Sequence, residues 1–184
     1  MLPLAAQPLW LPTENLAAGP WEPVCAPVRL ASAAASVSFA SIPAQYVMFR
    51  LRAEIIKDGT NGQAILRLNN DSAGNYARQM LHSADTTVNS ARVTAQTSIN
   101  VNNNIGAGLS ATLDIVIAKP IAGAAGLVLY SQGYMDSAGT PVINLDHIAG
   151  IWSNTADLIN RIDVLSDTTN FAAGSIFILE GSKS

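Results

Sequence analysis

Cysteine is nearly absent from this chain, with only Cys25 among 184 residues. A disulfide within the chain needs two cysteines and a thiolate metal cluster needs several, so neither is expected. No histidine stands near Cys25 in the sequence, and an isolated cysteine is more often a small apolar side chain than a nucleophile. The cysteine content gives no support to thiol chemistry.

Charged residues are also scarce, at 12% of the chain, which is about half the usual share in a soluble domain. The net charge is −3, and nucleic-acid-binding proteins normally carry a basic patch or stripe. Nucleic acid is therefore not an expected partner. A chain with so little charge is expected to bury part of its outer surface against copies of itself or within a larger assembly. The alternative is an Ala-rich monomer.

Long apolar runs are missing as well. No run of 18 apolar residues occurs, so a membrane-spanning helix is not expected. Proline interrupts each apolar run near the N-terminus and no basic leader precedes them, so we expect no secretory signal. The length suits a single well-buried domain.

What the chain does contain is alternation of apolar and polar residues at the period of a β-strand. The clearest example is 46–55, where Val47, Phe49, Leu51, Ala53 and Ile55 share one face. Arg50 and Arg52 fall on the opposite face beside Glu54 and are expected to be exposed side chains rather than a ligand-binding pair. The turn Asp58–Gly62 predicts a hairpin to Ala64–Leu68. Further strands are predicted at Tyr76–Leu81, Leu109–Ala118 and Leu127–Tyr134.

The section after Leu81, up to Asn104, is rich in Thr, Ser and Asn with few apolar residues. It is predicted to form an edge strand with loops, the part of the domain most exposed to partners. The C-terminal quarter, 141–181, predicts three strands centred on 148–152, 159–165 and 175–179. The turn-forming clusters 154–157 and 166–170 separate them.

Eight to ten short strands with no amphipathic helix predict an all-β fold. The expected architecture is a single antiparallel β-sandwich or a closed jelly roll, formed by residues 28–184. No period of 20–50 residues recurs, so propeller and solenoid folds are not expected.

Residues 1–27 differ from the rest because they hold six of the nine prolines. Proline fixes φ and removes a backbone donor, so neither a helix nor a central strand is expected there. The segment is nevertheless rich in tryptophan and leucine, unlike a disordered tail. It is predicted to be an extended arm that binds a neighbouring subunit or, equally, packs on its own domain. Its candidate partner-binding residues are Leu9, Trp10, Leu11, Trp21, Pro23 and Val24.

Candidate catalytic and metal-binding residues are few. The loop Asn69–Asn75 contains only one carboxylate, Asp71, and lacks the ladder of acidic ligands of a calcium loop. His82 and His147 stand apart from each other, and Asp146 with His147 is the one acid–imidazole pair that the sequence suggests. Neither Gly-x-Ser-x-Gly nor a phosphate-binding glycine loop occurs. We therefore expect no catalytic residue, no cofactor and no bound metal. An enzyme such as a depolymerase is the least favoured functional hypothesis.

Several segments in order resemble a family of single-domain β proteins built into the virions of tailed bacteriophages. The resemblance covers about Ser36 to Gly181. It rests on an opening strand and corner, a strand ending in an Asn/Asp turn and a tyrosine, and two closing hairpins. These segments are Val37–Tyr46 followed by Phe49, Leu51 and Arg52; Leu66–Tyr76; Gly150–Ala156; and Asn170–Ser175. The proline-rich arm is a departure from that family.

The resemblance implies a jelly-roll-like fold, a virion location and no enzymatic activity. Such proteins act as capsid decoration (cement) proteins or as parts of tail fibres and baseplates, commonly as homotrimers. A single domain with an apolar arm and no coiled-coil heptads favours a capsid decoration protein that contacts the major capsid protein. The alternative is a tail module that binds a host receptor or surface glycan.

Overall fold

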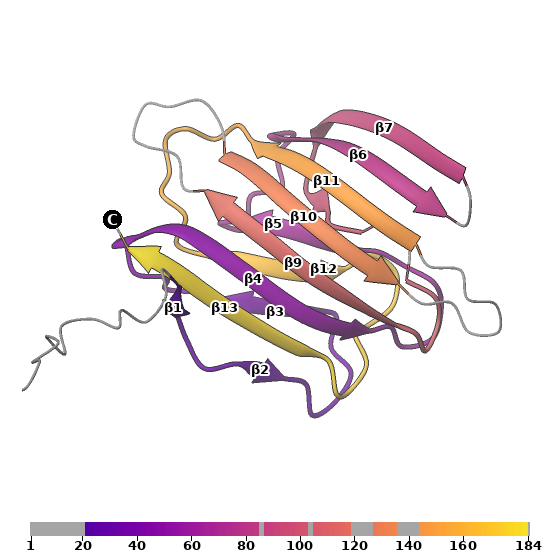
Figure 1. Ribbon diagram of the computed structural model, residues 1–184. Coiled ribbons are helices and arrows are strands. Elements are labelled where there is room, and N and C mark those ends of the chain that lie inside the picture. Colours follow the sequence, from indigo (N-terminus) through magenta and orange to yellow (C-terminus); the bar gives the residue numbers. More distant parts are fainter. Residues whose placement is uncertain (1–20, 85–86, 103–104, 119–126, 136–143, 184) are drawn as a thin grey trace, which may run out of the picture.

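The protein consists of antiparallel β-sheets in the computed structural model, which describes residues 21–84, 87–102, 105–118, 127–135 and 144–183 (Figure 1). Every regular element in these ranges is a strand, which confirms the all-β prediction. None of the described residues forms a helix long and apolar enough to cross a membrane.

Thirteen strands lie in the described ranges. They are β1 (Glu22–Pro23), β2 (Val28–Arg29), β3 (Ser36–Phe39), β4 (Tyr46–Ile56), β5 (Ala64–Leu68), β6 (Tyr76–Ala84), β7 (Thr87–Gln96), β8 (Ile99–Asn100), β9 (Ser110–Ala118), β10 (Leu127–Met135), β11 (Asn144–Trp152), β12 (Ile162–Ser166) and β13 (Ile176–Lys183).

The strands form two sheets. The larger has the order β1-β13-β4-β9-β10-β11-β6-β7, with β2 also paired to β13, and the smaller has the order β3-β12-β5-β8. In Figure 1 the smaller sheet lies behind the larger. The chain changes sheet between most consecutive strands from β3 onward. Among the thirteen described strands, neighbours in sequence pair with each other only as β6–β7, β9–β10 and β10–β11.

The predicted hairpin between 46–55 and 64–68 is wrong, because β4 belongs to the larger sheet and β5 to the smaller. Both strands are apolar on the face that enters the core, with Phe49 and Leu51 from β4 and Leu66 and Leu68 from β5 fully buried. The turn residues Asp58–Gly62 therefore carry the chain from one sheet to the other.

The three C-terminal strands occur near their predicted positions, but they do not pair with one another. The first and third, β11 and β13, lie in the larger sheet, whereas β12 lies in the smaller sheet between β3 and β5. The expectation of closing hairpins is therefore wrong. Strand β12 begins at Ile162 rather than at Ile159, although Ile159 is itself buried.

Both sheets contribute to one hydrophobic core. The predicted alternation in β4 is confirmed for Phe49, Leu51, Ala53 and Ile55, which are buried, and Val47 is half-buried. Trp152 is fully buried and stacks on Tyr76 with 6.5 Å between ring centroids. A second aromatic pair, Phe171 and Phe177, has centroids 5.4 Å apart.

Strand β7 lies at one edge of the larger sheet, as predicted for the polar section after Leu81. All its side chains are exposed except Val93, which is half-buried. At the opposite edge, β1 and β2 cover β13.

Candidate interaction site

The proline-rich N-terminal segment enters the described structure at Trp21 and continues along the outer edge of β13. Glu22 pairs with Gly181 and Pro23 with Glu180, and the Val24 amide donates a 3.0 Å hydrogen bond to the Leu179 carbonyl. A proline is tolerated here because β1 is an edge strand. We name Trp21–Pro27 the arm root, and it packs on its own domain.

The arm root contributes apolar contacts to the domain. Val24 is half-buried and packs against the core, as Val28 does after it. Trp21 is half-buried, and Pro23 and Cys25 are exposed. Pro23 and Val24 thus lie beside β13, and Trp21 directly precedes this segment. The other candidates, Leu9, Trp10 and Leu11, lie outside the described residues.

A polar cluster holds the arm root at the end of the sheet. The Tyr46 hydroxyl donates a 2.8 Å hydrogen bond to Glu22 Oε1, and Lys183 forms an ion pair with the same carboxylate. The hydrogen bond from Lys183, with that from Tyr46, holds the pKa of Glu22 below its ordinary value. The ammonium group of Lys183 also lies 5.5 Å from the centre of the Tyr46 ring. The first residues of the root are therefore tied to β4 and β13 by side chains as well as by backbone.

The loop 69–75, considered above for calcium, has its carboxylate occupied by protein donors. Asp71 accepts hydrogen bonds from Trp152 Nε1 at 2.7 Å, Asn75 Nδ2 at 2.9 Å and the Ala73 amide at 2.9 Å. Burial acts to raise the pKa of Asp71, but these hydrogen bonds outweigh it and the pKa is lowered. The loop therefore holds the buried indole of Trp152 in place, which is a structural role.

Asp146 pairs with a histidine other than the one that the sequence suggests. Its carboxylate is fully buried and lies 2.7 Å from His82 Nδ1 on the neighbouring strand β6. His147, adjacent in sequence, points to the opposite face of β11 and is exposed. Only the register between β6 and β11, in which Asp146 faces His82, could have revealed this pair.

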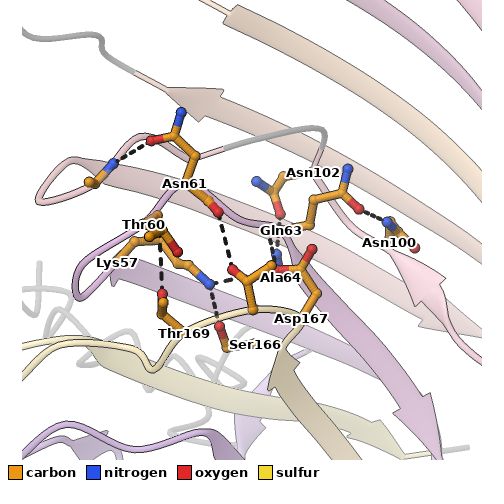
Figure 2. Close-up of polar contacts among 12 residues, drawn as sticks. Lys57, Thr60, Asn61, Gln63, Ala64, Asn100, Asn102, Ser166, Asp167 and Thr169 are labelled. Carbon is orange, nitrogen blue, oxygen red and sulfur yellow. Dashed lines mark hydrogen bonds and ion pairs between the residues drawn. The ribbon is translucent and has the colours of Figure 1, made fainter.

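A buried lysine that sequence reasoning missed lies where the chain crosses from β4 to β5. Lys57 has no exposed surface, and its ammonium group points between Ser166 and Asp167 (Figure 2). It contacts the Ser166 hydroxyl, lies 3.7 Å from Asp167 Oδ1, and sits 5.8 Å from the centre of the Phe171 ring. Burial lowers the pKa of Lys57, and the Asp167 carboxylate opposes that shift.

Protein groups pack closely around the ammonium group of Lys57. A Cβ on Gly62 would lie 2.6 Å from Asp167 Oδ1 and 2.7 Å from Lys57 Nζ. Asp167 Oδ1 also accepts a 2.6 Å hydrogen bond from the Gln63 amide, and Asn102 Oδ1 accepts one of 2.6 Å from the Ala64 amide. The cluster joins the crossing between the two sheets to the loop after β12. The burial of Lys57 could not be predicted from the sequence, because Lys57 directly precedes an ordinary turn.

The outer face of the larger sheet carries ion pairs between neighbouring strands. Arg50 of β4 binds Asp114 of β9 through two nitrogens, and Arg52 binds Glu180 of β13 in the same way. The prediction that both arginines lie on the outer face is confirmed, and each binds a carboxylate of an adjacent strand.

A hollow of about 500 Å³ lies beside the turn after β5, lined by Ile42, Ala44, Asn69, Asp157, Leu158, Ile159 and Asn160. Asn69 has a left-handed backbone, with φ of 52°, and its side chain holds the facing loop. Its Nδ2 donates a 2.8 Å hydrogen bond to the Leu158 carbonyl, and its Oδ1 accepts hydrogen bonds from the Asn160 and Arg161 amides. The hollow thus combines polar groups with the exposed side chain of Leu158.

No group of three or more His, Cys, Asp or Glu side chains in the described ranges is arranged to hold a metal ion. Comparisons with known proteins found no matching family, no similar curated protein and no similar solved structure.

Proposed function

We propose that this chain is a structural protein of a tailed-bacteriophage virion, and that its domain is a jelly-roll β-sandwich. The observation that carries the proposal is the alternation of consecutive strands between two antiparallel sheets. Strands β3, β5, β8 and β12 build the smaller sheet, while the strands between them in sequence build the larger one. Jelly rolls are built from two such sheets and occur in viral capsid and lectin domains.

Within the virion we propose a capsid decoration role, in which the protein stabilises the head through contacts between subunits. The arm root lies along an outer edge of the larger sheet, and the candidate attachment residues precede it in the sequence. Those residues include Leu9, Trp10 and Leu11. At about 25 cal/mol per Å² of apolar surface, a few hundred Å² per copy becomes a large total over a whole shell.

The proposed partners are other copies of the chain, as a homotrimer, and the major capsid protein. The low content of charged residues supports burial of outer surface in such an assembly. The proposed location is the capsid surface, after synthesis in the host cytoplasm. We propose no enzymatic activity, since the buried Lys57 and Asp146 contact protein side chains.

The second candidate is a tail module that binds a host receptor or surface glycan. The hollow beside Asn69 favours it, because Asp157 and Asn160 offer polar groups next to the apolar surface of Leu158. Sites for small ligands commonly combine an apolar lining with a few polar groups.

Labelled imaging of purified virions separates the two candidates. A capsid decoration protein places the label over the head, in many copies. Label confined to the tail supports the second candidate and contradicts the first. A binding screen against host surface polysaccharides, with Asp157→Ala as the control, then tests the hollow directly.

A further inference from the structure

Strand β7 differs from the other edges of the two sheets because it is long and uncovered. It has ten residues, and among the described residues no strand pairs with its outer side. The opposite edge of the larger sheet is covered by β1 and β2. The edges of the smaller sheet, β3 and β8, have only four and two residues.

Over its first seven residues, β7 also lacks the features that normally prevent edge strands from pairing. Edge strands are usually protected by Pro, by Lys and other charges, by bulges, or by shortness. The sequence of β7, TVNSARVTAQ, contains neither Pro nor Lys and has Arg92 as its single charge. Its first seven residues pair regularly with β6, and the register shifts only after Val93, where Ala95 has φ of 54°.

The open backbone of β7 is suited to another extended strand. The proline-rich N-terminal segment is a poor candidate, because each proline lacks the amide donor that a ladder requires. Strand β7 itself is a good candidate: its side chains are small or medium-sized and almost all exposed, and it has no like charges that an antiparallel copy must place together.

We propose that two copies of the chain join through antiparallel pairing of their β7 strands about a two-fold axis at Ser90. In such a dimer the two-fold axis is perpendicular to the sheet, so the outer faces of both copies lie on the same side of the joined sheet. Residues of antiparallel strands lie directly opposite each other, so the residue beside the axis faces the same residue of the second copy. Centring on Ser90 pairs the whole regular segment, 87–93, with itself. It places Arg92 opposite Val88 of the second copy, whereas centring on Arg92 would oppose two guanidinium groups.

The pairing continues the larger sheet from one copy into the next. The outer face near the axis then carries Leu81 and Val88 from both copies, which are 52% and 71% exposed in the single chain. This contact uses the edge opposite the arm root and joins two copies, so it can link one proposed trimer to another and does not depend on the proposed virion role.

Disulfide cross-linking tests the register. Cross-strand neighbours have Cα atoms about 4.5–5.5 Å apart, within the range that a disulfide bridges. In a Cys25→Ser background, Ser90→Cys should give a covalent dimer under mild oxidation. Val88→Cys is the matched control, since it lies on the same face and is highly exposed. In this register the two Val88 positions are about 13 Å apart along the strands, beyond the reach of a disulfide.

Sedimentation of the full chain at increasing concentration tests the contact itself. Ser90→Lys places two ammonium groups opposite each other at the axis and should shift the association to at least tenfold higher concentration. Thr112→Lys adds the same charge on the exposed outer face of β9, four strands away from β7, and should leave association nearly unchanged.

Equal weakening of association by the two lysine variants would overturn the proposed pairing. Equal cross-linking of the two cysteine variants would overturn it as well. So would a full chain that stays monomeric at its highest soluble concentration. None of these results bears on where the protein lies in a virion, because imaging tests that separately.

Discussion

Deleting the N-terminus in two steps separates attachment from folding. Removal of residues 1–20 leaves the arm root in place, and we expect the free energy of unfolding to stay within about 0.5 kcal/mol of that of the full chain, because the proposed role of the removed residues is attachment. Removal of residues 1–27 also takes away β1 and the contact of Val24 with the core. The second deletion is therefore expected to destabilise the domain.

The size of that loss follows from the contacts of the arm root. Each backbone hydrogen bond to β13 contributes about 1 kcal/mol net, and partial burial of Val24 contributes about another 1 kcal/mol. Ordering an edge segment costs conformational entropy, which offsets part of this sum. We expect the free energy of unfolding to fall by roughly 2–4 kcal/mol relative to the 1–20 deletion.

Urea denaturation of the three chains, followed by tryptophan fluorescence, measures these differences. Trp152 is fully buried and remains in every deletion, so it reports unfolding in all of them. Val24→Ala in the full chain is the matched control and should lose about 1 kcal/mol. Equal stability of the two deletions would refute the reasoning, because the arm root would then contribute nothing to the fold.

Three further predictions concern the core and pH. Tyr76→Phe removes the hydroxyl that accepts a 2.9 Å hydrogen bond from the Leu68 amide, so urea unfolding at pH 7 should show a loss of about 1–3 kcal/mol. Burial raises the pKa of Tyr76 to about 12, so the wild type should lose stability between about pH 10 and pH 12, and Tyr76→Phe should lose less in that window. Gly181→Ala places a Cβ 2.8 Å from Tyr46 Cγ and should cost about 1–3 kcal/mol by overpacking, measured by thermal unfolding; an unchanged melting temperature would contradict it. The pKa of Asp71 is lowered, so its contribution is present above about pH 4 and lost as the pH falls further, and Asp71→Asn should flatten acid unfolding curves in that range.

The local pattern of residues was sufficient to predict the strands. The alternation in 46–55 gave β4 and the identity of its buried face, and the lack of apolar residues after Leu81 gave an edge strand. Turn-forming residues marked where strands end. These features depend on neighbours in sequence, and the structure confirms them.

The choice of sheet could not be predicted in the same way. Strand β5 follows β4 after a short turn, which is typical of a hairpin, but the pairing partners of β5 are β12 and β8. Strand β12 joins β3, which lies more than a hundred residues earlier. Such pairings depend on how two apolar faces meet across the core, and a single sequence does not show this.

The buried polar pairs were missed for the same reason. Asp146 faces His82 only because β11 lies beside β6, and Lys57 reaches Asp167 only because β12 ends near the start of β5. Both pairs connect residues far apart in sequence. The arm residues Leu9, Trp10 and Leu11 remain a prediction.

Imaging of purified virions with a label on this protein tests the proposed capsid role most directly. The proposal predicts many labelled copies over the head, fewer with the 1–20 deletion than with the full chain. Label confined to the tail, or particles that contain no copies of the protein, would contradict it.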